Sequence, residues 1–201
     1  METKKQEALK FFREVDKMDN KQNYVNKSLI EIYTTSEEHF SVGTIINETE
    51  ENIFFKLFDE QGKEDGFYLF KKSCILSMKY DTSYLKKIAL YIEYWEKNKT
   101  EKKLENTFYY SCPDFLELLD YAEENEEIVT ISTNLKEEFL ITGYIKFCNE
   151  NEVEIECIDI ETAIPYEIIS ILKKDIVYFE IESIDNKLLK YANKTITNQI
   201  S

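Results

Sequence analysis

The sequence predicts an α+β protein made of two tandem, small, five-stranded antiparallel barrels, each preceded by an α-helix and joined by a linking helix. Three patterns support this prediction: an internal repeat with a period near 100 residues, short runs of alternating apolar and polar residues, and helical apolar stripes beside those runs. We expect domains at residues 1–98 and 104–201. A 201-residue chain is long enough for both, because a chain of this size buries roughly 70% of its unfolded surface.

The repeat is clearest where Gly43 falls on Gly143. The two matching segments, which share an apolar rhythm rather than identity, are "FSVGTIINETEENIFFKLFDE" (40–60) and "LITGYIKFCNENEVEIECIDI" (140–160). Further along the chain the same match continues at an offset of 101 residues. We therefore expect residues 28–82 and 128–183 to superpose as two barrels.

Three helices are expected from apolar residues at helical spacing. The first carries Ala8, Leu9, Phe11, Phe12 and Val15, and the third carries Phe115, Leu116, Leu118, Leu119 and Ala122 after a cap at Ser111 and a first-turn Pro113. Between them, residues 84–96 place Leu85, Ile88, Ala89, Ile92 and Trp95 on one face. We expect Trp95 to be buried because it completes that face.

Strands are expected where apolar and polar residues alternate. In the second copy, Val153, Ile155 and Cys157 alternate with Glu154 and Glu156, which predicts an inward apolar face and an outward acidic face. The four glutamates from Glu150 to Glu156 are therefore interpreted as one solvated strand face rather than as a metal or acid–base cluster.

A helix followed by five short antiparallel strands, with Gly43 or Gly143 midway along the second strand, resembles the Sm-like small barrel. Five-stranded barrels of the SH3 or OB kind are the alternative. The resemblance implies an RNA pocket formed by two loops, which usually carry an Asp and an Asn in the first and an Arg-Gly or Lys-His pair in the second.

The loops of this chain depart from that pattern. The first reads "NETEEN", with Glu48, Glu50 and Glu51, and the second reads "KKSC", with Lys71 and Lys72 and no glycine. Carboxylates repel phosphates, and RNA affinity depends mainly on neutralising phosphates. Nucleic-acid binding through Lys71 and Lys72 is therefore the alternative function, and we expect only weak binding of single-stranded RNA.

The composition argues against catalysis and cofactors. The chain has one histidine, His39, and four glycines that form neither a Walker loop nor a Rossmann fingerprint. The four cysteines show no C-x-x-C spacing and are interpreted as buried thiols of a reducing compartment. We expect a non-enzymatic protein with no cofactor and no metal.

Charge and hydropathy suggest where the protein works. Residues 1–100 carry 16 basic and 18 acidic residues, whereas the rest carries 9 and 22, within a formal net charge of −15. No apolar run approaches the ~20 residues of a membrane span, and the charged N-terminus lacks a signal-peptide core. We expect a cytoplasmic protein that does not contact membranes.

One strand face differs between the two copies. The first copy carries Phe54, Lys56 and Phe58, with Lys79 on a neighbouring strand, and the second copy is acidic at Glu154, Glu156 and Glu180. An aromatic and basic face of this kind is a candidate partner-contact site, unless a helix covers it. The predicted function is a non-catalytic, acidic cytosolic protein that binds another protein, of inhibitor, immunity or adaptor type. A basic partner suits its charge, and self-association is left open.

Overall fold

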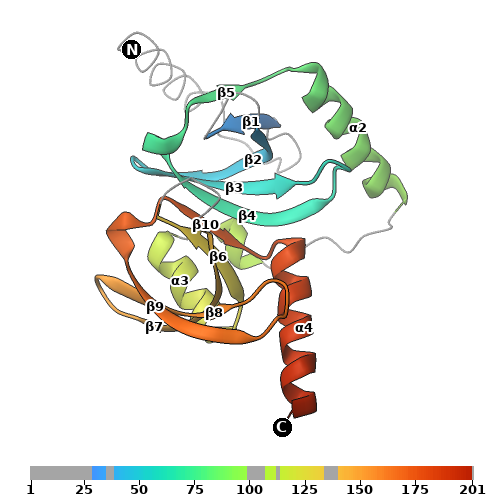
Figure 1. Ribbon diagram of the computed structural model, residues 1–201. Helices are drawn as coiled ribbons and strands as arrows, with labels where there is room; N and C mark the ends of the chain where they lie inside the picture. The colour runs from blue at the N-terminus through green and yellow to red at the C-terminus, as the bar shows by residue number, and fades with distance from the viewer. Residues whose placement is uncertain (1–28, 35–38, 99–106, 112–113, 134–139, 201) are drawn as a thin grey trace.

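The computed structural model describes residues 29–34, 39–98, 107–111, 114–133 and 140–200 (Figure 1). The first half contains β1 (Ile30–Tyr33), β2 (Phe40–Glu48), β3 (Asn52–Phe58), β4 (Glu64–Lys71), β5 (Ser77–Lys79) and α2 (Ser83–Asn98). The second half contains η2 (Thr107–Ser111), α3 (Phe115–Glu124), β6 (Ile128–Ser132), β7 (Leu140–Cys148), β8 (Glu152–Ile158), β9 (Pro165–Leu172), β10 (Tyr178–Ile181) and α4 (Ile184–Ile200). Two short 3-10 turns, η1 (Lys72–Cys74) and η4 (Lys173–Asp175), precede β5 and β10. The helix expected within residues 1–17 lies outside the described residues.

All ten described strands form one open antiparallel sheet in the order β5-β1-β2-β3-β4-β10-β6-β7-β8-β9. The prediction of two closed, five-stranded, Sm-like barrels is therefore wrong. In its place the structure has a single large sheet with three α-helices in the described residues. Each half does keep the same internal strand order, but β4 pairs with β10 of the other half instead of closing onto β5.

The pairing of β4 with β10, here called the internal joint, explains why the sheet stays open. Four residue pairs join the strands, from Tyr178 opposite Phe70 to Ile181 opposite Phe67. Phe67 and Phe179 belong to a shared core that also holds residues of the second half, while Phe70 and Tyr178 pack on a core of the first half. Because both faces of the joint are buried, apolar burial stabilises this pairing from two sides.

The internal repeat is visible in the strand register. Gly43 of β2 lies opposite Leu57 of β3, and Gly143 of β7 lies opposite Cys157 of β8. In both hairpins the register shifts two residues later, after Ile45 and after Ile145. A Cβ atom at Gly43 would lie 1.9 Å from a backbone carbonyl oxygen of β3, so this close approach requires glycine.

The linking helix predicted over residues 84–96 is present as α2, but its packing differs from the expectation. Leu85 and Ile88 are buried against Val42 of β2, and Ile92 packs beside them. Trp95 is only half-buried, and its indole N–H donates to the backbone oxygen of Gln61 at 2.8 Å. The prediction of a buried Trp95 is wrong because its ring lies by the β3–β4 turn, with the Lys63 Nζ atom 5.0 Å from the ring centre, and outside the apolar cluster of Val42, Leu85 and Ile88.

The N-cap of helix α3 lies three residues later than the sequence suggested. Its N-cap is Asp114, not Ser111: the Asp114 carboxylate accepts from two backbone N–H groups, and Glu117 bonds back to the Asp114 N–H. Ser111 lies in η2, where its hydroxyl donates to the oxygen of Phe108. The buried face of α3, formed by Leu118, Leu119 and Ala122, packs into the shared core.

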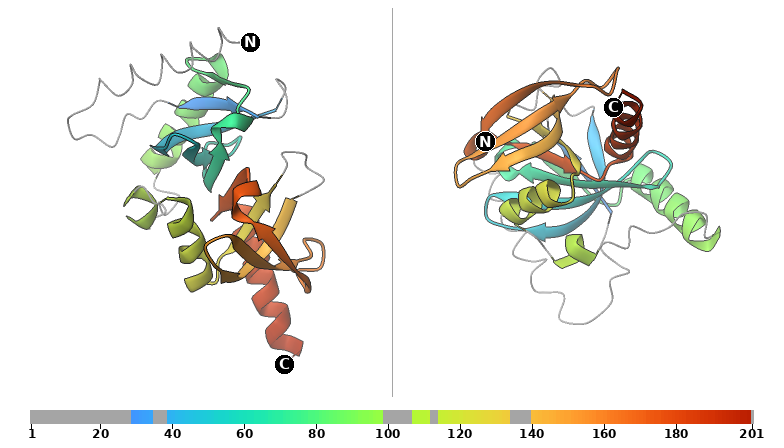
Figure 2. Two further views of the ribbon diagram at one scale, coloured as in Figure 1. Left: turned by 90° about the vertical axis from the view of Figure 1, so that its left-hand side faces the viewer. Right: turned by 90° about the horizontal axis from the view of Figure 1, so that it is seen from below.

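Helix α4 was not predicted. It follows β10 as α2 follows β5, and it projects away from the sheet at the C-terminal end of the chain (Figure 1, Figure 2). The 101-residue offset that links Ser83 to Ile184 is the sequence signal for it. Among the described helices, none is both long and apolar enough to cross a membrane.

Candidate functional site

The two edges of the sheet are β5 and β9, and β9 is the longer, with eight residues against three. Among the described strands, β9 pairs only with β8. Its exposed apolar side chains are Tyr166 and Ile168, each 62% exposed, and Leu172, 38% exposed. Long apolar edges are normally shielded because their free backbone groups invite another strand. The edge of β9 is therefore the leading candidate for an interaction site.

An open groove of about 730 Å³ runs beside this edge, and we call it the β9 groove. Its lining comes from β9, from the end of β6, from β7, from η4 and from the segment between η4 and β10. The lining residues are Thr133, Ile141, Ile169, Ser170, Ile171, Leu172, Lys174, Asp175 and Val177. The groove thus places apolar side chains directly next to a strand edge that has hydrogen-bonding capacity to spare.

The internal joint shows what fills the matching space in the first half. Strand β4 corresponds to β9 at an offset of 101 residues, because Phe70 pairs with Ile53 and Ile171 pairs with Val153. In the first half, the ring of Tyr178 from β10 lies 5.2 Å from that of Tyr68 and 5.7 Å from that of Phe70. Strand β10 therefore takes beside β4 the place that no described strand takes beside β9.

The outer face of the β9 edge is acidic. Glu154 of β8 lies opposite Ser170 of β9, and Glu156 lies opposite Ile168. Glu156 forms an ion pair with Lys146 at 2.9 Å. Glu167 on β9 is exposed and lies opposite Cys157, on the groove side of the strand, so carboxylates lie on both sides of this edge. The alternation of Val153, Ile155 and Cys157 inward is confirmed, since all three are fully buried.

The candidate partner face predicted from the sequence is not gathered on one exposed surface. Phe54 is 3% exposed and stacks on Phe67 at 5.6 Å, inside the shared core. Lys56 is 9% exposed and forms an ion pair with Glu64. Phe54 is covered because the internal joint brings the second half against it.

The other two residues of that face lie apart from Phe54. Phe58 is half-buried and packs with the α2 cluster around Val42 and Leu85. Lys79 on the β5 edge is exposed and lies with its Nζ atom 4.1 Å from the centre of the Tyr33 ring. These four residues therefore do not form one exposed face.

The lysines of the alternative nucleic-acid site are engaged with the protein itself. Lys72 forms an ion pair with Glu48, one of the acidic residues of the neighbouring loop. Lys71 donates through its Nζ atom to the backbone oxygen of Lys174, and through its backbone N–H to the oxygen of Val177 at 3.0 Å. Lys71 is thus part of the internal joint.

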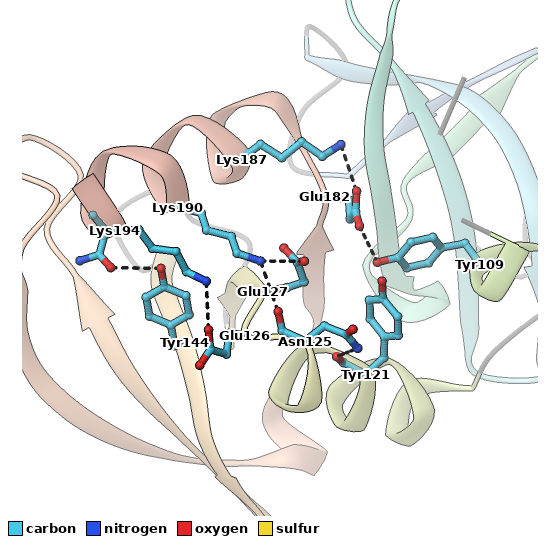
Figure 3. A network of polar contacts seen from close by, with 11 residues as sticks. Tyr109, Tyr121, Asn125, Glu126, Glu127, Tyr144, Glu182, Lys187, Lys190 and Lys194 are labelled. Carbon is cyan, nitrogen blue, oxygen red and sulfur yellow. Dashed lines mark hydrogen bonds and ion pairs between the residues drawn. The ribbon is translucent and has the colours of Figure 1, made fainter. Parts of the chain in front are cut away.

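Helix α4 is attached to the second half by polar contacts rather than by an apolar face (Figure 3). Lys190 forms an ion pair with Glu127 at 2.8 Å, and Lys194 forms one with Glu126 at 2.9 Å. The Tyr144 hydroxyl donates to the side-chain oxygen of Asn193 at 3.1 Å, and burial raises the pKa of Tyr144 to about 12. These contacts fix α4 without using its exposed apolar residues Leu188 and Tyr191.

Within the described residues, no group of three or more His, Cys, Asp or Glu side chains is arranged to hold a metal ion. His39 is exposed at the start of β2. The β9 edge was not predicted from the sequence, although the sequence indicates it. The segment "YEIISIL" (166–172) is apolar at most positions and directly follows Pro165, a residue typical of edge strands.

Comparisons of this chain with protein families, with characterised proteins and with solved structures find no match.

Proposed function

We propose that this chain is a non-catalytic interaction protein that binds another protein by adding an extended segment of that protein to the sheet at β9. The observation that carries the proposal is the long, apolar edge of β9 beside the open β9 groove. In strand addition, main-chain hydrogen bonds supply affinity and a neighbouring pocket supplies specificity. The edge and the groove together provide both.

The internal joint supports this proposal from within the molecule. There β4, the counterpart of β9, accepts β10 as an antiparallel neighbour over four residue pairs. The same strand geometry is therefore compatible with an added strand when one is supplied. A short β5, with three residues, offers much less backbone for such pairing.

Charge and thiol chemistry fit the same role. The outer face beside β9 carries Glu154 and Glu156, which suits a partner segment with basic residues. Cys74, Cys148 and Cys157 are free thiols, as is usual in a reducing compartment, and we place the protein in the cytoplasm on this basis.

The backbone amides of β9 that face the open edge can be identified from hydrogen bonds. The N–H of Lys71 points toward β10, and Leu172 is its counterpart in β9. The N–H of Lys173 points the other way, to the oxygen of Asn151. Since amides alternate along a strand, those of Ile168, Ser170 and Leu172 face the open edge.

The decisive experiment removes one of these amides without touching the β8–β9 ladder. A Ser170→Pro variant lacks an edge N–H, and Ser170→Ala is the matched control that keeps it. We expect a partner purified with the wild-type protein to bind Ser170→Ala normally and to bind Ser170→Pro at least about tenfold more weakly.

Hydrogen exchange then locates the contact. Binding should slow exchange of the Ile168, Ser170 and Leu172 amides in the wild-type protein. A partner that binds Ser170→Pro as tightly as Ser170→Ala, with no protection in β9, would show that the proposal is wrong. Circular dichroism of both variants confirms that each remains folded.

A further inference from the structure

We infer that the strand that β9 accepts comes from a different protein, runs antiparallel to β9, and alternates a groove face carrying an aromatic side chain with an outer face carrying basic side chains. This inference rests on the proposed strand addition and specifies its partner. It follows from comparing the β9 edge, position by position, with the internal joint.

The internal joint fixes the expected register. Tyr178 lies opposite Phe70, and Glu180 lies opposite Tyr68. The counterparts of Phe70 and Tyr68 in β9 are Ile171 and Ile169, and both line the β9 groove. The residues of an added strand that lie opposite Ile171 and Ile169 therefore face the groove.

The size of the groove points to an aromatic residue opposite Ile171. In the first half the Tyr178 ring occupies this position and contacts two aromatic rings. In the second half the two contacting positions hold the smaller Ile169 and Ile171, and a groove of about 730 Å³ is open there. An aromatic side chain buries a large apolar area in such a space at little loss of rotamer entropy.

The other face of the added strand lies next to Ile168, Ser170 and Leu172 of β9, and the carboxylates of β8 lie one strand further on the same face. In the first half this face is apolar, because Phe54 and Leu69 are buried there. Their counterparts in the second half are Glu154 and Ser170, which lie opposite each other on β8 and β9. A residue opposite Ser170 on an added strand therefore lies in line with Glu154, with Ser170 between the two. Lysine or arginine at this position reaches the Glu154 carboxylate.

A second copy of this chain does not meet these requirements. Of the two edges of its described sheet, β9 carries no basic side chain, and β5 has Lys79 and Ser77 where β10 has Glu180 and Tyr178. Ser77 at the anchor position would leave most of the β9 groove unfilled, so this edge would bury little apolar area there.

A steric difference between β4 and β9 also argues against a second copy of this chain. A Cβ atom at Gly66 would lie 2.5 Å from the backbone nitrogen of Ser183, so the internal joint tolerates only glycine there. The counterpart of Gly66 in β9 is Glu167, whose side chain would block the same close approach by the β5–α2 turn of another copy. An extended segment that is not followed by such a turn avoids this conflict.

The inference is tested with synthetic peptides of eight residues whose ends are blocked. The reference peptide carries tyrosine and valine on the face that meets the groove and two lysines on the opposite face. Three variants replace tyrosine by serine, replace both lysines by glutamate, or methylate the backbone nitrogens on the pairing edge. Titration calorimetry and chemical-shift changes in β9 report the affinity and the location of binding.

We expect the serine variant to bind about tenfold more weakly than the reference peptide, because the groove anchor is lost. The glutamate variant should bind about threefold more weakly at low salt, and this difference should vanish in a Glu154→Gln protein. The N-methylated peptide should not shift the β9 signals. A Glu154→Gln protein that still discriminates between lysine and glutamate would overturn the assignment of the basic face.

Other outcomes separate this inference from the proposed function. Equal binding of the tyrosine and serine peptides at β9 overturns the inferred chemistry and leaves strand addition standing. Self-association that rises with concentration and is lost in Ser170→Pro makes a second copy the occupant, which also overturns the inference alone. If no peptide and no partner protects the β9 amides, both the inference and the proposed function fail.

Discussion

Leu85 and Asn186 occupy the same position of the two helices that close each half, and each is only 4% exposed. Leu85 packs against the apolar cluster on β2, whereas the Asn186 side-chain oxygen accepts from the Thr130 hydroxyl at 3.1 Å. The same replacement of an apolar residue by asparagine recurs two helical turns later, where Ile92 of α2 corresponds to the buried Asn193 of α4. Duplicated helices are thus attached to their sheet by opposite kinds of interaction.

Asn193 should be important for holding α4 in place. Its amide donates to the oxygen of Ala163 at 2.9 Å and its oxygen accepts from Tyr144. We expect Asn193→Ala to lower the free energy of unfolding by about 2 kcal/mol, because buried partners lose their hydrogen bonds. Urea denaturation measures this change. Asn198→Ala, on the exposed side of the same helix, is the control and should change stability by less than about 0.5 kcal/mol.

Replacing Asn186 should have the opposite effect and raise the stability of the protein. Within the described residues its buried side-chain nitrogen has no hydrogen-bond partner, and Thr130 keeps a second partner in Thr142 at 3.0 Å. Asn186→Leu restores the residue type of α2 and removes an unsatisfied donor. We expect it to raise the free energy of unfolding by about 1 kcal/mol. A loss of stability in the same denaturation experiment would contradict this account of the helix.

The ion pairs of α4 should contribute according to their burial (Figure 3). The side chains of Lys190 and Glu127 are 21% and 18% exposed, whereas those of Lys194 and Glu126 are 49% and 72% exposed. We expect Lys190→Gln to lower stability by about 1 kcal/mol and Lys194→Gln by less than about 0.5 kcal/mol. Repeating the denaturation in 1 M salt should shrink both effects, and equal losses at low salt would refute the ranking.

Gly143 should tolerate no side chain. A Cβ atom there would lie 2.1 Å from the backbone oxygen of Glu156, and the strand cannot move away without breaking its register. We expect Gly143→Ala to lower stability by about 3 kcal/mol or to prevent folding. The control is Leu140→Ala on the same strand, where the side chain is 51% exposed and the change introduces no new atom. Thermal melting followed by circular dichroism distinguishes the two variants.

Glu180 at the internal joint predicts a pH dependence of stability. Burial raises the pKa of Glu180, and the Tyr178 hydroxyl donates to its carboxylate. A raised carboxyl pKa means that the folded state favours the protonated form. At pH 7.5 the carboxylate is charged, and burying that charge lowers the free energy of unfolding. That cost falls as the pH drops toward the ordinary glutamate value of about 4.3.

Glu180→Gln should therefore stabilise the protein at pH 7.5, and its advantage over the wild type should shrink as the pH is lowered to 5. Urea denaturation at several pH values measures the difference. Glu167→Gln, at an exposed position of β9, is the control and should show no such trend. A constant advantage at every pH would mean that the charge of Glu180 is not the cause.

Local patterns in the sequence determined the elements of this protein. The alternation of Val153, Ile155 and Cys157 predicted the inner face of β8, and the apolar stripe of Leu85 and Ile88 predicted α2. These predictions were confirmed because period and burial are set by neighbouring residues. The repeat that links Gly43 to Gly143 was likewise visible, because both copies need the same close approach between strands.

Only the tertiary structure decided how the strands join. Side-chain alternation shows which face of a strand is buried, but it does not show which strand its backbone edge will pair with. That choice depended on the burial of both faces of β4 against β10, and it moved Phe54 from an expected surface into the shared core. Among the described strands, the same choice left β9 at the edge of the sheet, which is why the candidate site became visible only once the whole sheet was assembled.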